Sequence, residues 1–120
     1  MPWKLSADKP IYLQLMDHIK ADVVAGNYKP GDKIPSVREL AAAAGVNPNT
    51  MQKALSELER EGLLFSERTS GRFVSDDPAR IEQTKVTQAK ELTHDYLGRM
   101  KQLGFERDAV TEFILQNNEE

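Results

Sequence analysis

Residues 36–58 read SVRELAAAAGVNPNTMQKALSEL and contain two helix starts separated by one helix stop. The opening SVRE matches a capping box, in which a hydroxyl at the N-cap is followed three residues later by a carboxylate. The first helix is expected to end at Gly45. Asn47 and Pro48 begin the second helix, because asparagine is a favoured N-cap and proline a favoured first helical residue. Two helices this close together predict a helix-turn-helix.

Apolar side chains recur at helical spacing in this motif and in the segment before it. That segment, residues 10–26, predicts a further helix that has Pro10 as its first residue and ends at Gly26. Spacings of three and four residues place one side of each helix against a common core. The residues expected in this core are Ile11, Leu15, Ile19 and Val23, then Val37, Leu40, Ala41 and Ala44, and finally Met51, Ala54, Leu55 and Leu58.

A β-hairpin is predicted directly after the motif. Residues 63–68 and 72–74 are two short strand-like segments, and Thr69-Ser70-Gly71 supplies the turn between them. Asp76-Asp77-Pro78 then indicates a domain boundary. The expected fold class is therefore mainly α with a small β-hairpin, and residues 1–77 are expected to form a winged helix-turn-helix domain.

The remaining residues, 78–120, predict two helices rather than a second globular domain. In the longer helix, over 79–103, apolar residues step by three and four positions, as in a heptad seam, and a shorter helix is expected over 107–116. Two helices can pair two subunits, but they offer no large pocket for a small-molecule effector. The same seam would also allow the long helix to fold back on its own domain. The expected dimerisation residues are Val86, Tyr96, Met100, Leu103, Phe113 and Ile114.

Composition excludes several classes of function. The chain of 120 residues carries no cysteine, which removes disulfides, thiolate metal sites and cysteine nucleophiles. Its two histidines, His18 and His94, have no ligand-like neighbours at helical spacing except carboxylates on ordinary charged faces, and no glycine-rich phosphate loop occurs. The pattern therefore predicts no catalysis, metal or cofactor. The amino terminus lacks the apolar core of a signal peptide, and no apolar run reaches the ~20 residues of a membrane span, which predicts a cytoplasmic protein.

The outward face of the second helix of the motif has the chemistry that reads DNA. In a helix-turn-helix this helix enters the major groove with its N-terminal end first. Its outward residues carry amides, hydroxyls and an ammonium, which bind base edges and phosphates. Glu57, Glu59 and Glu61 come later in the helix, away from that end. Such a polar face is also typical of ordinary solvated positions, and it is the capping box, the short turn and the hairpin together that favour DNA.

Further candidate DNA contacts lie on both sides of this helix. Arg38, in the first turn of the preceding helix, can hold a phosphate through two N–H groups. Arg68 and Arg72 flank the hairpin turn, where a wing needs cations, and Gly71 allows close approach of the backbone. Asn47 is more readily explained as an N-cap than as a base reader. The candidate DNA-binding residues are Ser36, Arg38, Asn47, Asn49, Thr50, Gln52, Lys53, Arg68, Gly71 and Arg72.

The order of these motifs resembles the amino-terminal domain of the GntR family of bacterial transcription regulators. The matching segments are residues 10–12, 26–41, 45–54, 58–63 and 71–74. The tetrapeptide Asn47-Pro48-Asn49-Thr50 and the short C-terminal part are similar to the YtrA-like subfamily. The resemblance implies a winged helix-turn-helix that binds operator DNA as a dimer. It also implies DNA contacts at Arg38, at the start of the recognition helix and at Gly71.

We therefore expect a homodimeric, sequence-specific transcription regulator, a repressor, that reads a palindromic operator in double-stranded DNA with half-sites ~10 bp or a multiple apart. The alternative is a winged-helix module that binds protein without binding DNA, and the net charge of −3 favours it slightly. Residues 1–77 hold 10 Lys and Arg against 11 Asp and Glu, so positive charge toward DNA has to be local. Non-specific DNA binding is then expected to be weak at physiological salt.

Overall fold

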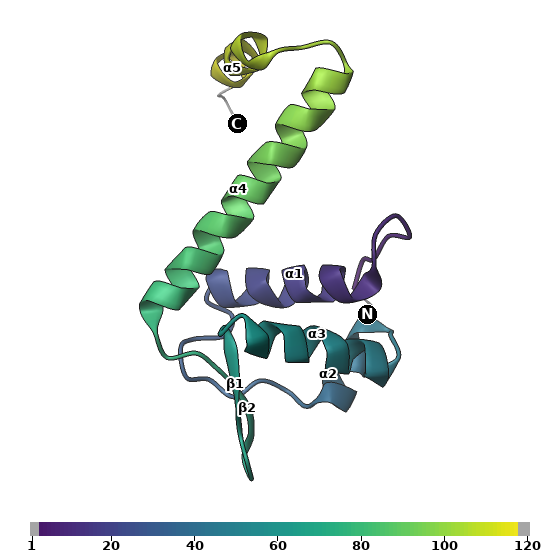
Figure 1. Cartoon of the computed structure of the whole chain (residues 1–120), viewed down its shortest axis with the longest axis vertical. Helices are drawn as coiled ribbons and strands as arrows, with labels where there is room; N and C mark the ends of the chain where they lie inside the picture. Colours follow the sequence, from purple (N-terminus) through teal and green to yellow (C-terminus); the bar gives the residue numbers. More distant parts are fainter. Residues whose placement is uncertain (1–2, 118–120) are drawn as a thin grey trace. The chain divides into compact units, whose positions relative to one another are not determined.

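The computed structural model describes residues 3–117, which form five helices and a two-stranded hairpin (Figure 1). In chain order the elements are α1 (Ile11–Val24), α2 (Val37–Ala44), α3 (Pro48–Arg60), β1 (Leu64–Glu67), β2 (Gly71–Val74), α4 (Pro78–Gln102) and α5 (Arg107–Gln116). By its contacts the chain divides into two compact units, Met1–Lys85 and Val86–Glu120. The predicted fold class, mainly helical with a small hairpin, is confirmed.

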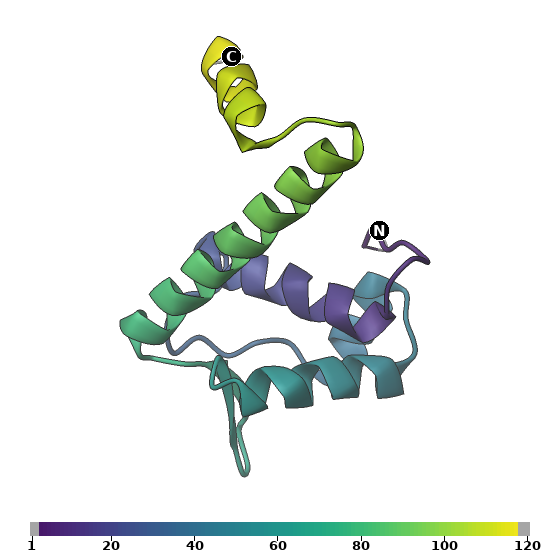
Figure 2. The ribbon, with the colours of Figure 1, turned by 45° about the horizontal axis from the view of Figure 1, so that its top comes forward.

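The first unit has a core in which α1 and α2 both pack on α3 (Figure 1, Figure 2). The predicted core residues of α3 are completely buried, each with an exposed fraction of 0%. All the other predicted core residues are buried except Ile11 and Val37, which lie half-buried at its edge. Burial of a leucine-sized side chain stabilises a fold by roughly 1.5–3 kcal/mol. The buried face of α3 therefore holds its opposite face in a defined orientation.

Helix ends follow the predicted caps, with corrections of one residue at the start of α1 and at both ends of the long helix, which spans Pro78–Gln102 rather than 79–103. The Ser36 Oγ accepts a hydrogen bond from the Glu39 amide at 3.1 Å, and the Glu39 carboxylate accepts one from the Ser36 amide at 2.9 Å, which completes the capping box of α2. The prediction that Pro10 is the first residue of α1 is wrong by one position. Pro10 keeps an extended ψ of 136° as the N-cap, while its carbonyl already accepts a hydrogen bond from the Gln14 amide.

The hairpin is attached to the first unit at its base. Val74 is completely buried, and its amide donates a hydrogen bond to the Asp32 carbonyl at 2.8 Å. The Ile34 amide donates to the Arg72 carbonyl at 3.0 Å, so the loop before α2 runs beside β2 as a third segment. This support matters because a two-stranded hairpin is marginally stable alone. The register pairs Leu64 with Val74, Phe65 with Phe73, Ser66 with Arg72 and Glu67 with Gly71.

The start of α4 belongs to the first unit. Asp77 caps the helix, since its Oδ1 accepts a hydrogen bond from the Ala79 amide at 3.0 Å. Ile81 packs against the core, which explains why the first compact unit extends to Lys85, beyond the boundary expected after residue 77. Throughout the described part of the chain, every helix is too short or too polar to cross a membrane.

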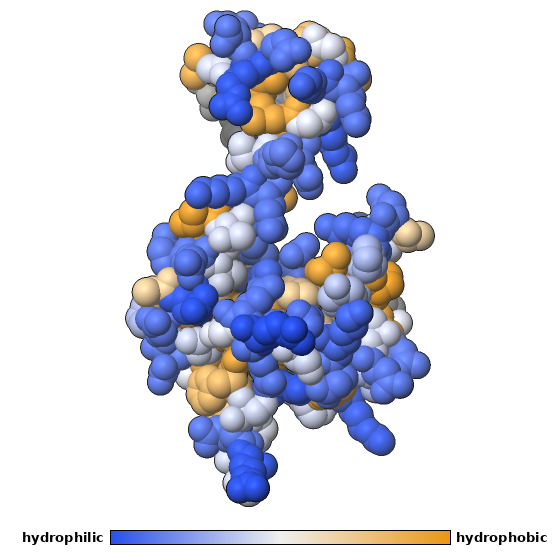
Figure 3. All heavy atoms as spheres, in the orientation of Figure 1, coloured by the Kyte–Doolittle hydropathy of each residue, from blue (hydrophilic) through white to orange (hydrophobic). Residues whose placement is uncertain are grey.

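Most apolar side chains of the second unit are exposed. None of the 25 residues of α4 is fully buried, and Val110 is the buried residue of α5. Figure 3 shows apolar side chains at the surface of the C-terminal unit. Leu92 and Leu103 have exposed fractions of 71% and 72%. The predicted dimerisation residues are exposed, apart from the half-buried Met100: Val86, Tyr96, Leu103, Phe113 and Ile114.

Candidate nucleic-acid interface

The first half of α3 presents a polar face opposite its buried one. Asn49, Gln52 and Lys53 are exposed, and Thr50 is half-buried. The Gln52 side-chain amide donates a hydrogen bond to the Ser56 hydroxyl at 3.0 Å, one turn further along the helix. The sequence between Asn47 and Ser56 contains no acidic residue, so this face offers amides, hydroxyls and one cation to a polar or anionic partner.

Asn47 is the N-cap of α3, as the sequence predicts. Its Oδ1 accepts a hydrogen bond from the Asn49 amide at 2.7 Å, and its carbonyl accepts one from the Thr50 amide at 3.0 Å. The cap uses both oxygens of the residue. Of the polar groups on the Asn47 side chain, the NH₂ group therefore remains to offer a hydrogen bond to a ligand.

Lys53 is oriented by a residue that sequence reasoning missed. Its Nζ lies 4.0 Å from the centroid of the Tyr12 ring of α1. A cation over an aromatic face at an exposed site gains about 0.5–1 kcal/mol, enough to favour one placement of a long, mobile side chain. Tyr12 lies outside the four-residue stripe that marks the core face of α1, and no local spacing rule connects it with α3. Only the packing of α1 on α3 brings the two side chains together.

The first turn of α2 combines a cation with a capped helix end. Arg38 is exposed there. The hydrogen bonds from the Ser36 backbone and hydroxyl hold the pKa of Glu39 below its ordinary value, and nearby Lys33 lowers it further. The carboxyl is therefore ionised at neutral pH and keeps the cap in place. The amides of the first helical turn that no cap uses are the groups that attract an anion at a helix N-terminus.

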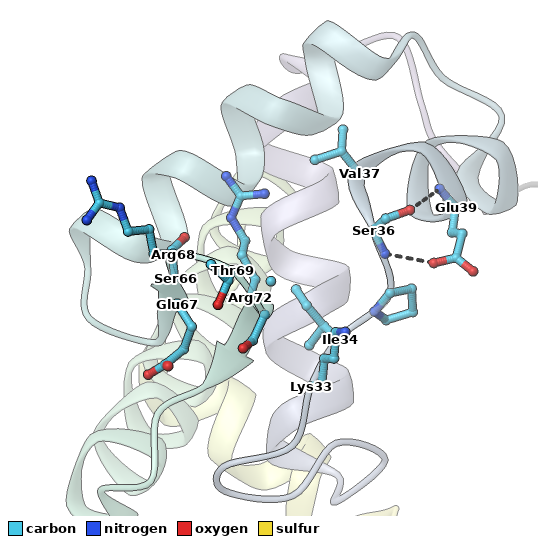
Figure 4. A pocket seen from close by; sticks show the side chains of 13 residues that line it. Lys33, Ile34, Ser36, Val37, Glu39, Ser66, Glu67, Arg68, Thr69 and Arg72 are labelled. Atoms are coloured by element: carbon cyan, nitrogen blue, oxygen red, sulfur yellow. Dashed lines mark hydrogen bonds between the residues drawn. The ribbon is translucent and has the colours of Figure 1, made fainter.

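A groove of about 620 Å³ runs between the hairpin and the start of α2. Figure 4 shows Ser36 and Glu39 on one side and Arg68 and Glu67 on the other, with Lys33 and Arg72 between them. The hydroxyl and cationic groups that line it come from Lys33, Ser36, Ser66, Arg68, Thr69, Ser70 and Arg72. Four predicted site residues therefore meet in one groove, although α2 and the hairpin are far apart in sequence: Ser36, Arg68, Gly71 and Arg72.

Lys33 is a second residue that sequence reasoning missed. It lies in a turn-rich loop, but a β-bridge to Phe73 sets it against the hairpin. A Cβ atom on Gly71 would lie 3.1 Å from the Lys33 Cε, and Gly71 has a φ of +112° that other residues rarely adopt. The glycine therefore serves two purposes here: it allows the turn of the hairpin, and it leaves room for the stem of the lysine side chain.

The two arginines of the hairpin differ in their surroundings. Arg68 is exposed at the tip. Arg72 is instead held by α3, because its Nε lies 3.0 Å from the Glu59 Oε2 and its side chain is only 18% exposed. Glu59 is thus not a solvated acid at the end of α3 but part of the contact between helix and hairpin.

The neighbouring acids at the end of α3 are also paired with cations. The Glu57 carboxylate lies 3.3 Å from Arg60, and the Glu61 carboxylate lies 3.1 Å from the Nζ of Lys20 on α1. Their negative charge is therefore compensated locally. Among residues 3–117 no three His, Cys, Asp or Glu side chains are arranged to hold a metal ion.

Comparison with known proteins identifies the family that has this arrangement. Residues 11–74 match the family of bacterial regulatory proteins named gntR. The chain belongs to the GntR family. The matched region extends from the first residue of α1 to the last residue of β2, and so includes α3 and the whole hairpin. From here on α3 is called the recognition helix and the hairpin the wing. The resemblance inferred from the sequence motifs is confirmed.

Two relatives from Bacillus subtilis are similar over most of their length. The chain is 37% identical to YhcF, an uncharacterized HTH-type transcriptional regulator, over 111 residues that cover 92% of each chain. It is 39% identical to the HTH-type transcriptional repressor YtrA over 106 residues, which cover 88% of this chain and 82% of YtrA. Alignments of this length include α4, and they agree with the predicted likeness to YtrA.

Solved structures of similar proteins support the same assignment. A GntR family transcriptional regulator from Listeria monocytogenes superposes with a TM-score of 0.83 at 37% identity, covering 93% of this chain and 98% of that one. The structure of AraR(DBD) in complex with operator ORX1 has a TM-score of 0.54 at 29% identity, covering 62% of this chain and 99% of that one. The chain thus belongs among transcriptional regulators rather than enzymes.

Proposed function

We propose that the chain is a transcriptional repressor that binds a palindromic operator as a homodimer. The observation that carries this proposal is the polar, acid-free outer face of the first half of α3, in a domain that also has a groove lined by Lys33, Arg68 and Ser36. Among the relatives, YtrA is named as a repressor, and AraR(DBD) has been crystallised with an operator. Both support a DNA ligand for the same fold.

The proposed contacts divide into base readout and phosphate binding. The N-terminal half of α3 enters the major groove, where Asn49 and Gln52 offer amides to base edges. Lys53, which Tyr12 orients, binds a phosphate beside them. Arg38, in the first turn of α2, and the groove under the wing take phosphates of the flanking backbone.

Local rather than overall charge makes this interface favourable to DNA. The chain has a net charge of −3, yet the acids at the end of α3 are all paired with cations, whereas Arg38, Lys53 and Arg68 are exposed. Each phosphate neutralised contributes about 0.9 to the slope of log K against log salt. A small number of cations therefore predicts a shallow salt dependence and weak non-specific binding.

The exposed apolar side chains of α4, of α5 and of the turn that follows α4 are the proposed dimer interface. Leu92 and Leu103 are more than two-thirds exposed in a single chain. A second copy related by two-fold symmetry would cover the same side chains of both protomers at once. The pair of recognition helices would then read two half-sites of opposite orientation. A bacterial repressor of this kind acts on the chromosome, and we therefore place the protein in the cytoplasm; no effector is part of the proposal.

Selection from a random double-stranded DNA library tests this function. The full-length chain should enrich a palindromic sequence, and the enriched duplex should shift in a gel more strongly at low salt than at physiological salt. The Lys53→Ala variant should bind this duplex more weakly, whereas Lys90→Ala, which removes an exposed lysine from α4, should bind like the wild type. A chain that enriches no sequence and gives no salt-sensitive shift would instead be a protein-binding module.

A further inference from the structure

Glu59, in the last turn of α3, bonds both strands of the wing. Its Oε2 accepts a hydrogen bond from the Arg72 Nε at 3.0 Å and another from the Ser66 hydroxyl. Ser66 and Arg72 are cross-strand partners in the hairpin. One carboxylate oxygen therefore links the recognition helix to a single cross-strand pair of the wing, Ser66 and Arg72, which we call the rung. We propose that Glu59 is a positioning residue, which sets the direction of the wing relative to the recognition helix and thereby the affinity for operator DNA.

The position of this rung in the hairpin explains why it matters. The base of the wing is held by main-chain hydrogen bonds, such as that from the Val74 amide to the Asp32 carbonyl. Beyond the rung of Ser66 and Arg72, one further pair and the turn remain, and every residue from 67 to 71 is exposed. The rung is therefore the last anchored point before the tip. Without Glu59, this pair would keep the main-chain hydrogen bond from the Ile34 amide to the Arg72 carbonyl, which holds β2 but not β1. The tip would then be held less firmly on a two-stranded ribbon, which is weakly stable alone.

Burial and charge separate this contact from an ordinary surface ion pair. The side chains of Arg72 and Glu59 are only 18% and 27% exposed, whereas the Glu57–Arg60 pair leaves Arg60 78% exposed. Hydrogen bonds in which both partners are charged are short and strong. The Arg72 guanidinium therefore binds the Glu59 carboxylate rather than a phosphate. Its role in DNA binding is to hold the wing.

Whether removal of Glu59 weakens or strengthens DNA binding distinguishes a positioning role from a purely electrostatic one. An acid beside a DNA-facing groove repels phosphates, so its removal should strengthen binding if charge is all that matters. Removal of Glu59 also releases Arg72, which would strengthen binding further. If Glu59 positions the wing, its removal should weaken binding, although the protein becomes less negative.

The matched pair of variants is Glu59→Ala and Glu57→Ala, which make the same change of charge two residues apart on one helix. The proposal rests on the DNA-binding function above, and the probe is the duplex enriched by the wild-type chain. Glu59→Ala should bind it about tenfold more weakly, because ordering even one residue on binding costs roughly tenfold in affinity. Glu57→Ala should bind equally or more tightly. Equal or tighter binding by Glu59→Ala would overturn the proposal.

A second variant and a measurement without DNA keep the test independent of stability and of the proposed function. Glu59→Gln retains a neutral acceptor for Ser66 and Arg72 and should lose less affinity than Glu59→Ala. In free protein, amide hydrogen exchange of residues 66–72 should be faster in Glu59→Ala, while exchange in the core of α3 stays unchanged. Unchanged exchange in the wing would overturn the proposal even if the chain binds no DNA. Faster exchange in a chain that binds no DNA would support the anchor and refute only its effect on operator affinity.

Discussion

Replacement of Leu103 by alanine is expected to weaken the proposed homodimer about 30-fold. The side chain is 72% exposed in the single chain, and complete burial of a leucine is worth roughly 1.5–3 kcal/mol. Alanine keeps the Cβ atom, so covering the remaining exposed part is worth about 1 kcal/mol per protomer. A two-fold interface contains the residue twice, which gives about 2 kcal/mol per dimer, or roughly 30-fold in the dissociation constant.

Sedimentation equilibrium over a range of concentrations measures this change directly. Leu13→Ala is the matched control, because Leu13 is also an exposed leucine, 38% accessible, but lies on α1 outside the proposed interface. The control should leave the dimer constant unchanged. Leu103→Asp should shift the equilibrium further toward monomer, since it would place a carboxylate in an apolar contact. Equal dimer constants for Leu103→Ala and the wild type, or a wild type that is monomeric, would refute the interface.

Four other variants probe separate parts of the chain. Arg38→Ala should weaken DNA binding across sequences and lower the salt slope by about one, which gel shifts at several salt concentrations can measure; an unchanged slope would exclude a phosphate contact. Leu55→Ala should lower the free energy of unfolding in urea by about 2–5 kcal/mol, since the side chain is completely buried. Ser36→Ala should cost about 1 kcal/mol through the lost cap. Because the pKa of Glu39 is lowered in the folded chain, its contribution to stability is complete above the ordinary pKa of glutamate and is lost as pH falls through the lowered value. Acid unfolding of Glu39→Gln should lack that part of the pH dependence.

Local patterns in the sequence were sufficient to predict the helices, the hairpin and most of the core that the helices contribute, but not the buried Ile34, Leu63, Leu64 and Val74. The capping box at Ser36, the Asn47 cap with Pro48, and the three- and four-residue spacing of apolar side chains all act within one or two helical turns. Such interactions depend on neighbours in the chain, and so they can be recognised without knowledge of the rest. The same patterns identified α3 as the helix whose outward face is free to bind a ligand.

Contacts between distant residues could not be predicted, and they change the description of the binding surface. Tyr12 orients Lys53 across two helices, Lys33 joins the groove under the wing, and Glu59 holds Arg72. In the sequence, Arg72 resembles a free cation beside a turn. It is the packing of helix and hairpin that turns it toward a carboxylate, because the direction of a long side chain depends on which partner the fold brings within hydrogen-bond distance. The sequence thus determines which elements form and which faces they bury, whereas the folded chain determines which charges remain available to DNA.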